Sequence, residues 1–127
     1  MEFDATLILI GEEEESSGRV ADDARGANVI PIDQQLYQEG DEPWDRGEHV
    51  GEAYGIAITT PSGRAVCNLT FEFGDEDSIA MHGVLRVEGN AIGSGMMAVV
   101  GGTGKFHQAS GSVRVEHRNP KRYRLML

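Results

Sequence analysis

The chain has 127 residues, enough for one domain of ordinary size, and 39% of them are hydrophobic, enough to fill a single core. It carries 21 Asp and Glu against 11 Lys and Arg, a formal net charge of -10, so most of its surface would repel phosphate-rich partners. We therefore expect no nucleic-acid ligand. The single cysteine, Cys67, excludes an internal disulfide and a thiolate metal cluster, and it fits a reducing compartment.

The first apolar run, residues 5–10, does not resemble a targeting segment. It is short, it follows the acidic residues Glu2 and Asp4, and it lacks both a basic segment before it and a small-residue cleavage site after it. No other run approaches the length that crosses a membrane. We expect a cytoplasmic protein without a membrane partner.

Short runs of β-branched and aromatic residues, separated by turn residues, fill most of the sequence and predict β-strands. Pro31 favours an edge position or a bulge in its strand, and the sequence Thr-Pro-Ser-Gly at residues 60–63 is typical of a hairpin turn. In chain order the expected strands span residues 3–10, 28–37, 49–59, 64–73, 78–88, 92–100, 112–118 and 121–127.

Eight successive strands with short connections predict an all-β fold, an eight-stranded antiparallel up-and-down β-barrel that removes its exposed edges by closing on itself. A β-sandwich of the same strands is the alternative. Residues 1–127 would form one barrel domain. The polar loop expected at residues 38–48 holds the only tryptophan, Trp44, which would either cap the barrel mouth as a lid or lie in a subunit contact.

Alternation along the expected strands gives the barrel an apolar interior. One strand supplies small inward side chains, and this row predicts a cavity. The alternative is that the small residues complement bulkier side chains in a packed interior. The small row is Gly51, Ala53, Gly55, Ala57 and Thr59, and the facing apolar residues are Ala65, Cys67, Leu69, Phe71, Phe73, Ile79, Met81 and Leu85.

Three segments resemble a known family. Residues 99–106 (VVGGTGKF), followed by Ala109 and Gly111, resemble the VVGGTGxFxxAxG signature of the dirigent and allene oxide cyclase barrel superfamily. Residues 31–37 (PIDQQLY) look like the PFTNKLY stretch of allene oxide cyclases, and residues 71–75 (FEFGD) look like their FYFGD turn. The resemblance implies the same barrel. The signature glycines are expected to form a structural turn rather than a phosphate cradle, because no P-loop pattern accompanies them.

Several family positions differ in this chain. Dirigent proteins have an arginine where this chain has Ser110, which argues against radical coupling of the dirigent type. Plant allene oxide cyclases carry a lumen cysteine and a lumen glutamate at the positions of Ala57 and Ile10, which argues against cyclopentenone formation. Their lumen asparagine corresponds to Gln34, which keeps an amide able to hydrogen-bond a ligand oxygen.

A third branch of the same superfamily occurs in bacterial polyketide, tetramate and tetronate pathways. Its members are small proteins of about this length that look like pericyclases. This resemblance implies a Diels-Alderase-type cyclase of bacterial specialised metabolism, which folds a linear polyene-type substrate in the apolar lumen. Such a reaction requires no proton shuttle. Orientation alone can contribute on the order of 7–11 kcal/mol at its favourable extreme.

Gln34 and Tyr123 are the predicted catalytic anchors, because a hydrogen bond from either to a carbonyl would polarise the dienophile. No metal or other cofactor is expected, since His49, His82, His107 and His117 lack the spacing of metal ligands. Cys67 is expected to be a buried apolar residue rather than a nucleophile. The predicted substrate-binding residues are Ile32, Trp44, Ala57, Leu69, Phe71, Met81, Leu85 and Met96.

Other functions are compatible with the same pattern. The barrel could be a non-catalytic carrier of a hydrophobic ligand, a dirigent-like protein, or a structural oligomer. Apolar residues on the outer strand face, namely Ile56, Ile58, Val84 and Val99, predict association with copies of the same chain as a homodimer or a homotrimer. A carboxylate from residues 12–15 could reach the lumen mouth, although such an acidic run is more typical of a solvated strand end.

Overall fold

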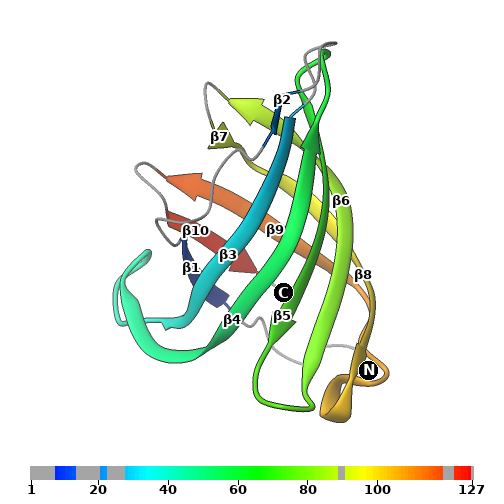
Figure 1. Ribbon diagram of the computed structural model, residues 1–127. Helices are drawn as coiled ribbons and strands as arrows, with labels where there is room; N and C mark the ends of the chain where they lie inside the picture. The colour runs from blue at the N-terminus through cyan, green and yellow to red at the C-terminus, as the bar shows by residue number, and fades with distance from the viewer. Residues whose placement is uncertain (1–7, 14–20, 23–27, 89–90, 119–121, 127) are drawn as a thin grey trace.

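Figure 1 shows the computed structural model of the chain, which describes residues 8–13, 21–22, 28–88, 91–118 and 122–126. These residues form β-strands and one short 3-10 helix, η1 (Gly104–Phe106). The strands are β1 (Ile8–Glu13), β2 (Ala21–Asp22), β3 (Asn28–Glu39), β4 (Arg46–Thr59), β5 (Arg64–Glu72), β6 (Ser78–Glu88), β7 (Ala91–Ile92), β8 (Gly95–Thr103), β9 (Ser112–Arg118) and β10 (Arg122–Met126).

Eight of these strands form a closed barrel. In the order β1, β3, β4, β5, β6, β8, β9 and β10, each pairs antiparallel with the next. The circuit closes because β1 also pairs with β10, which removes the last sheet edge. The two-residue strands β2 and β7 add to β3 and β6. The predicted eight-stranded up-and-down barrel is confirmed.

Strand boundaries differ from the predicted ones at several positions. β1 runs on to Glu13, past its predicted end at residue 10, and β8 begins at Gly95 rather than at residue 92. β3 and β4 extend into residues 38–48, so only residues 40–45 remain as a turn. Polar sequence is compatible with strand here because the residues at both strand ends are largely exposed. β8 runs on to Thr103, through two glycines that we expected in the connection. Residues 3–7 of the first predicted strand lie outside the described residues.

Pro31 lies at a position of β3 that tolerates the loss of an N–H donor. It pairs with Ile56 on the β4 side. On the other side, the described pairing with β1 ends at Gln34 and the pairing with β2 begins at Val29. Between these two positions no described strand needs the missing donor, which explains how a proline fits inside a long strand.

The core fills the inside of the barrel, and β5 shows why. Its inward positions Ala65, Cys67, Leu69 and Phe71 are buried, whereas the outward positions between them are partly or fully exposed. This period of two follows from strand geometry, in which successive side chains point to opposite faces. No helix among the described residues is long and apolar enough to cross a membrane.

The connections alternate between two ends of the barrel, because every strand runs antiparallel to the next. The turn at residues 40–45, the turn at residues 73–77 and η1 lie at one end, in the lower part of Figure 1. We call this the Trp44 end. The hairpin turn at residues 60–63, where the Thr60 N–H donates to the Arg64 carbonyl (2.8 Å), lies at the opposite end, the Gly63 end.

Candidate ligand-binding site in the barrel

Six of the eight predicted substrate-binding residues lie in the hydrophobic cluster that fills the barrel. Their side chains come from four neighbouring strands and are almost completely buried, so the inward alternation predicted for these strands is confirmed. The six are Ile32 on β3, Ala57 on β4, Leu69 and Phe71 on β5, and Met81 and Leu85 on β6. The structure therefore brings them into one apolar interior, but burial alone does not show that they touch a ligand.

Three inward glycines lie against large neighbours, namely Gly55 of the small row on β4, Gly83 on β6 and Gly95 on β8. A β-carbon added to Gly55 would lie 2.8 Å from Leu69 Cδ2, and one added to Gly95 would lie 2.6 Å from Leu85 Cδ2. A β-carbon on Gly83 would lie 2.9 Å from the side chain of Met97. Because real β-carbons do not approach other atoms this closely, the glycines provide space that adjacent side chains already use. These positions support the packed-interior alternative.

Met96 was predicted to line the cavity, and this placement is wrong. Its side chain lies on the outer face of β8 and is 49% exposed, whereas Met97 is 1% exposed and lies inside. Adjacent residues of a strand point to opposite faces, so only one of the two methionines can be inward. The pairing of Met97 with Gly83 on β6 decides which one it is, because the gap above Gly83 accommodates the Met97 side chain.

Trp44 lies in the tight turn between β3 and β4. Its backbone has φ of 72°, an uncommon value for a residue with a side chain, and its N–H donates to Glu39 Oε2 (2.9 Å). The Gly40 N–H donates to the Asp45 carbonyl (2.8 Å) and closes the turn. The indole is partly buried. A lid function for this turn stays a prediction.

Gln34, like Thr59, is a buried polar residue inside the barrel. It is 7% exposed and lies between Ile32 and Leu36 on the inward face of β3. Its Oε1 atom lies 2.6 Å from the place that a β-carbon of Gly11 on β1 would occupy. Among the described residues, the Gln34 amide makes no side-chain hydrogen bond. An inward amide with no side-chain partner among the described residues can bind water or a ligand.

Tyr123 lies close to the same glycine from the other side. It is buried, with 6% of its surface exposed, and pairs with Gly11 in the ladder between β1 and β10. Gln34 and Tyr123, the two predicted anchors, therefore flank β1 from β3 and β10. Only the closure of the barrel brings them together.

His117 is a third polar residue of this cluster, and our interpretation of the sequence missed it. It pairs with Tyr123 across β9 and β10, and the two ring centroids lie 4.8 Å apart with the planes tilted by 35°. The alternation of Val113, Val115 and His117 on one face of β9 could have identified it. Together, Gln34, Tyr123 and His117 form what we call the polar seam.

Cys67 lies in the core between Ala65 and Leu69 and is 1% exposed. Burial raises the pKa of its thiol to about 11, because a thiolate would lose its hydration there. The Sγ–H donates a weak hydrogen bond to the Ala65 carbonyl (3.6 Å). The thiol is therefore protonated at neutral pH and does not act as a nucleophile, in agreement with its predicted role as a small apolar residue.

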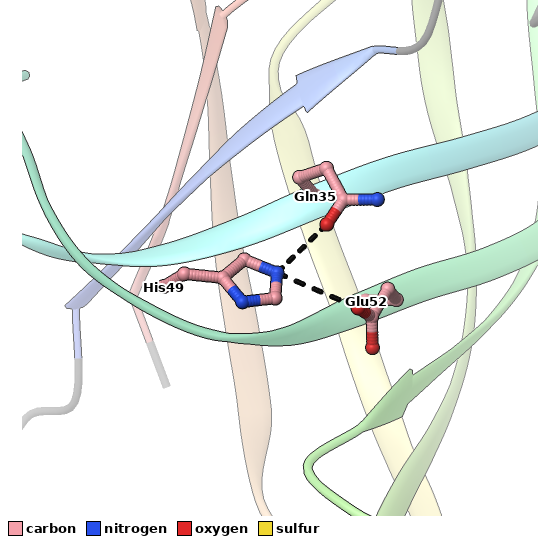
Figure 2. A network of polar contacts seen from close by, with 3 residues as sticks. All are labelled: Gln35, His49 and Glu52. Carbon is pink, nitrogen blue, oxygen red and sulfur yellow. Dashed lines mark hydrogen bonds and ion pairs between the residues drawn. The ribbon is translucent and has the colours of Figure 1, made fainter.

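The outside of the barrel carries a separate polar network. His49 Nε2 lies 2.7 Å from Gln35 Oε1 and 3.4 Å from Glu52 Oε1, as Figure 2 shows. Gln35 follows Gln34 directly on β3 and therefore faces the opposite side of the sheet. The described residues contain no group of three or more His, Cys, Asp or Glu side chains that could hold a metal ion.

The glycine-rich signature forms a structural turn at the Trp44 end. Gly104 has φ of +61°, a left-handed conformation that glycine adopts without strain. The Lys105 N–H donates to Asp77 Oδ1 (3.0 Å), and Thr103 Oγ1 donates to the Glu76 carbonyl (2.8 Å). These bonds attach η1 to the turn between β5 and β6, which lies 28 residues earlier in the sequence at the Lys105–Asp77 contact.

This geometry agrees with the comparisons to known proteins. The model of the family described as "Dirigent-like protein" matches residues 6–125, nearly the whole chain. The chain belongs to the dirigent-like family. A search of curated proteins gave no significant match. The predicted membership of the dirigent and allene oxide cyclase superfamily is confirmed, while no comparison tests the link to bacterial Diels-Alder cyclases.

Solved structures show the same fold as this dirigent-like chain. Pyocyanin demethylase superimposes with a TM-score of 0.67 at 19% identity, over 97% of this chain and 100% of that chain. A pterocarpan synthase dirigent protein superimposes with a TM-score of 0.71 at 20% identity, over 96% of this chain and 82% of that chain. At such identities the likeness concerns the fold, and function must be argued from the site.

Proposed function

We propose that this dirigent-like protein binds a hydrophobic, unsaturated small molecule inside the barrel and promotes its intramolecular cyclisation. The proposal depends on one observation, the nearly buried amide of Gln34, which has no hydrogen-bond partner among the described residues. The walls beside it are apolar, and Tyr123 adds a second polar group on the far side of β1. This combination suits an apolar ligand with one polar end.

In a cyclisation of the Diels-Alder type, a diene and a dienophile of one molecule form two carbon–carbon σ bonds at the expense of two π bonds. No proton, electron or leaving group is transferred, so the chemistry needs neither an acid–base pair nor a cofactor. The barrel holds the chain folded, which reduces the entropic part of the barrier. An N–H of Gln34 donates to a carbonyl conjugated with the dienophile and stabilises the charge that develops on it.

A synthetic linear trienone, with a terminal diene and an enone joined by a saturated tether, tests this proposal. The protein should accelerate the formation of the bicyclic isomer, which has the same mass as the substrate. Gln34→Leu removes the amide and keeps an apolar side chain of similar size, so we expect a loss of about 1 kcal/mol, roughly fivefold, in kcat/KM.

Gln35→Leu is the matched control, since the neighbouring amide faces the outside and contacts His49. This variant should keep the wild-type rate. A protein that leaves the isomerisation of the trienone at its rate in buffer would contradict the cyclase proposal, and equal rates for the two variants would contradict the role of Gln34.

A second candidate function is that of a carrier that binds a hydrophobic ligand and returns it unchanged. The apolar side chains that line the interior, such as Leu69, Phe71 and Met81, favour it, because holding a hydrophobic ligand needs no polar anchor. Binding of the fluorescent probe N-phenyl-1-naphthylamine would show that the barrel has a binding site, which both functions require. Fluorescence enhancement together with unreacted trienone would support the carrier.

A further inference from the structure

A β-bulge in β4 brings His49 and Glu52 to the same side of the barrel wall. Tyr37 on β3 pairs with His49, whereas the residue before Tyr37 pairs with Gly51, so Val50 is an extra residue of β4. Residues three apart in a regular strand point to opposite faces, and one extra residue reverses this relationship. The side chains of His49 and Glu52 therefore both lie on the outside, where they are 47% and 31% exposed.

A third donor atom comes from the neighbouring strand β3. His49 Nε2 lies 2.7 Å from Gln35 Oε1 and 3.4 Å from Glu52 Oε1, so two oxygens approach one nitrogen, as Figure 2 shows. Both oxygens are acceptors, so in this arrangement Nε2 carries the proton. The N–H donates to Gln35 at an ordinary distance, but the distance to Glu52 is longer than that of a good hydrogen bond. One proton therefore binds the two oxygens unequally.

We propose that Gln35, His49 and Glu52, which we call the His49 cluster, bind a divalent transition-metal ion such as Zn²⁺. Imidazole and carboxylate are ordinary zinc ligands, the amide oxygen is a weaker third ligand, and water completes the coordination. Ligands bound at about 2.1 Å in tetrahedral geometry lie about 3.4 Å apart. The distance between Nε2 and Glu52 Oε1 has this value. The ion takes the place of the Nε2 proton, which moves through solvent to Nδ1.

Groups around the His49 cluster favour a bound cation. Glu72 on β5 pairs directly with Glu52, and both lie on the outer side, so a second carboxylate adds negative charge beside the cluster. Like charges opposite one another destabilise a sheet, and a cation between strands reduces this cost. The Tyr37 ring packs edge-on against His49 with 5.4 Å between centroids, and the Arg46 guanidinium covers Tyr37 at 4.7 Å. These contacts limit rotation of the imidazole, as outer partners do for ligating histidines.

The spacing of the histidines led us to expect no metal, because the His49 cluster is not visible as a sequence pattern. It contains only one histidine, its third donor is an amide on another strand, and the bulge that aligns His49 with Glu52 follows from the register of β3 and β4. The proposal does not depend on the function of the barrel interior, since Gln35 faces away from Gln34.

Isothermal titration calorimetry of the full chain with zinc chloride tests the proposal. The wild type should bind Zn²⁺ in the micromolar range, as expected for an exposed site with one weak ligand. His49→Ala and Glu52→Gln should each weaken binding at least about tenfold. Gln35→Glu replaces the amide by a carboxylate and should strengthen binding at least about tenfold, a gain that damage to the fold would not produce.

His82→Ala is the matched control. His82 lies on the outer side of β6, and its Nδ1 atom lies 2.7 Å from Asn68 Oδ1, so it makes the same kind of imidazole–amide contact. It has no carboxylate partner among the residues that the structure describes, and its loss should leave the affinity for Zn²⁺ unchanged. Co²⁺ gives a second measurement, since four-coordinate cobalt absorbs strongly in visible light. This absorption should appear in the wild type and in His82→Ala and be absent from His49→Ala.

Three results would overturn the proposal. Equal affinity of the wild type and His49→Ala for Zn²⁺, with both folded by circular dichroism, excludes His49 as a ligand. Unchanged or weaker binding by a folded Gln35→Glu variant excludes the amide oxygen from the site. Equal losses of affinity in His82→Ala and His49→Ala would show adventitious binding by surface histidines.

Discussion

The side-chain oxygen of Gln34 occupies the space above Gly11, 2.6 Å from where a β-carbon on that glycine would lie. The two residues belong to β3 and β1, which pair antiparallel as successive strands of the barrel. Because Gly11 has no side chain, the Gln34 amide can occupy this position, and we propose this amide as the ligand anchor. The polar seam depends on this contact.

Gly11→Ala should displace the Gln34 amide and weaken turnover of the linear trienone about fivefold, the equivalent of one lost hydrogen bond. The contacting atom ends a flexible side chain, so we expect the free energy of unfolding to change by less than about 1 kcal/mol. In a Gln34→Ala background the same substitution should have no further effect on kcat/KM. Additive effects in this double-mutant cycle would show that Gly11 acts independently of Gln34.

The two adjacent methionines of β8 should differ in their effect on stability. Met97→Ala removes a buried side chain from the core and should lower the free energy of unfolding by about 2–5 kcal/mol. Met96→Ala removes an exposed one and should change it by about 0.5 kcal/mol or less. Urea denaturation measures both. A larger loss for Met96→Ala would mean that the register of β8 is shifted by one residue.

Gly104 and Gly63 both adopt positive φ, but only Gly104 has close neighbours. A β-carbon there would collide with Asp77 Oδ1 and the Glu76 carbonyl, whereas at Gly63 nothing lies within 4 Å. Gly63→Ala should therefore cost about 1–2 kcal/mol from backbone strain alone. Gly104→Ala should cost more, because it also separates η1 from the turn between β5 and β6. Thermal unfolding of the two variants compares them directly, and equal losses would contradict a structural role of the signature turn.

The Cys67 thiol should make stability depend on pH in the alkaline range. Its pKa rises from an ordinary value of 9.0 to about 11 on folding, so between these values the unfolded chain releases a proton that the folded chain keeps. Stability is therefore full below about pH 9 and falls by about 2–3 kcal/mol as pH rises to about 11. Urea midpoints across this range should show the loss in the wild type.

Cys67→Ala is the control, since it removes the titrating group and should flatten this part of the pH profile. Maleimide labelling gives a second measurement, and Cys67 should react at neutral pH only after unfolding. Rapid labelling of the folded protein would contradict the burial of the thiol.

The sequence by itself determined most of the barrel. Alternation over residues 64–73 and 78–88 identified strands, hairpins and inward faces, because a side-chain period of two is a local property of an extended chain. The signature at residues 99–111 identified the superfamily. The sequence also indicated Gln34 and Tyr123 as polar residues of the interior, since both fall on inward positions of their strands.

Tertiary structure alone decided how these residues are combined. Closure of β1 between β3 and β10 brings Gln34 and Tyr123 to either side of Gly11 and adds His117, and no local pattern contains that information. Register decided that Met97 and not Met96 is inside, because both are equally apolar. The pairing of β4, β5 and β6 placed Arg64 beside Arg86 and Glu72 beside Glu52. A contact between strands far apart in the chain, β1 and β10, thus settled the polar seam, whereas the pairings among β4, β5 and β6 join consecutive strands.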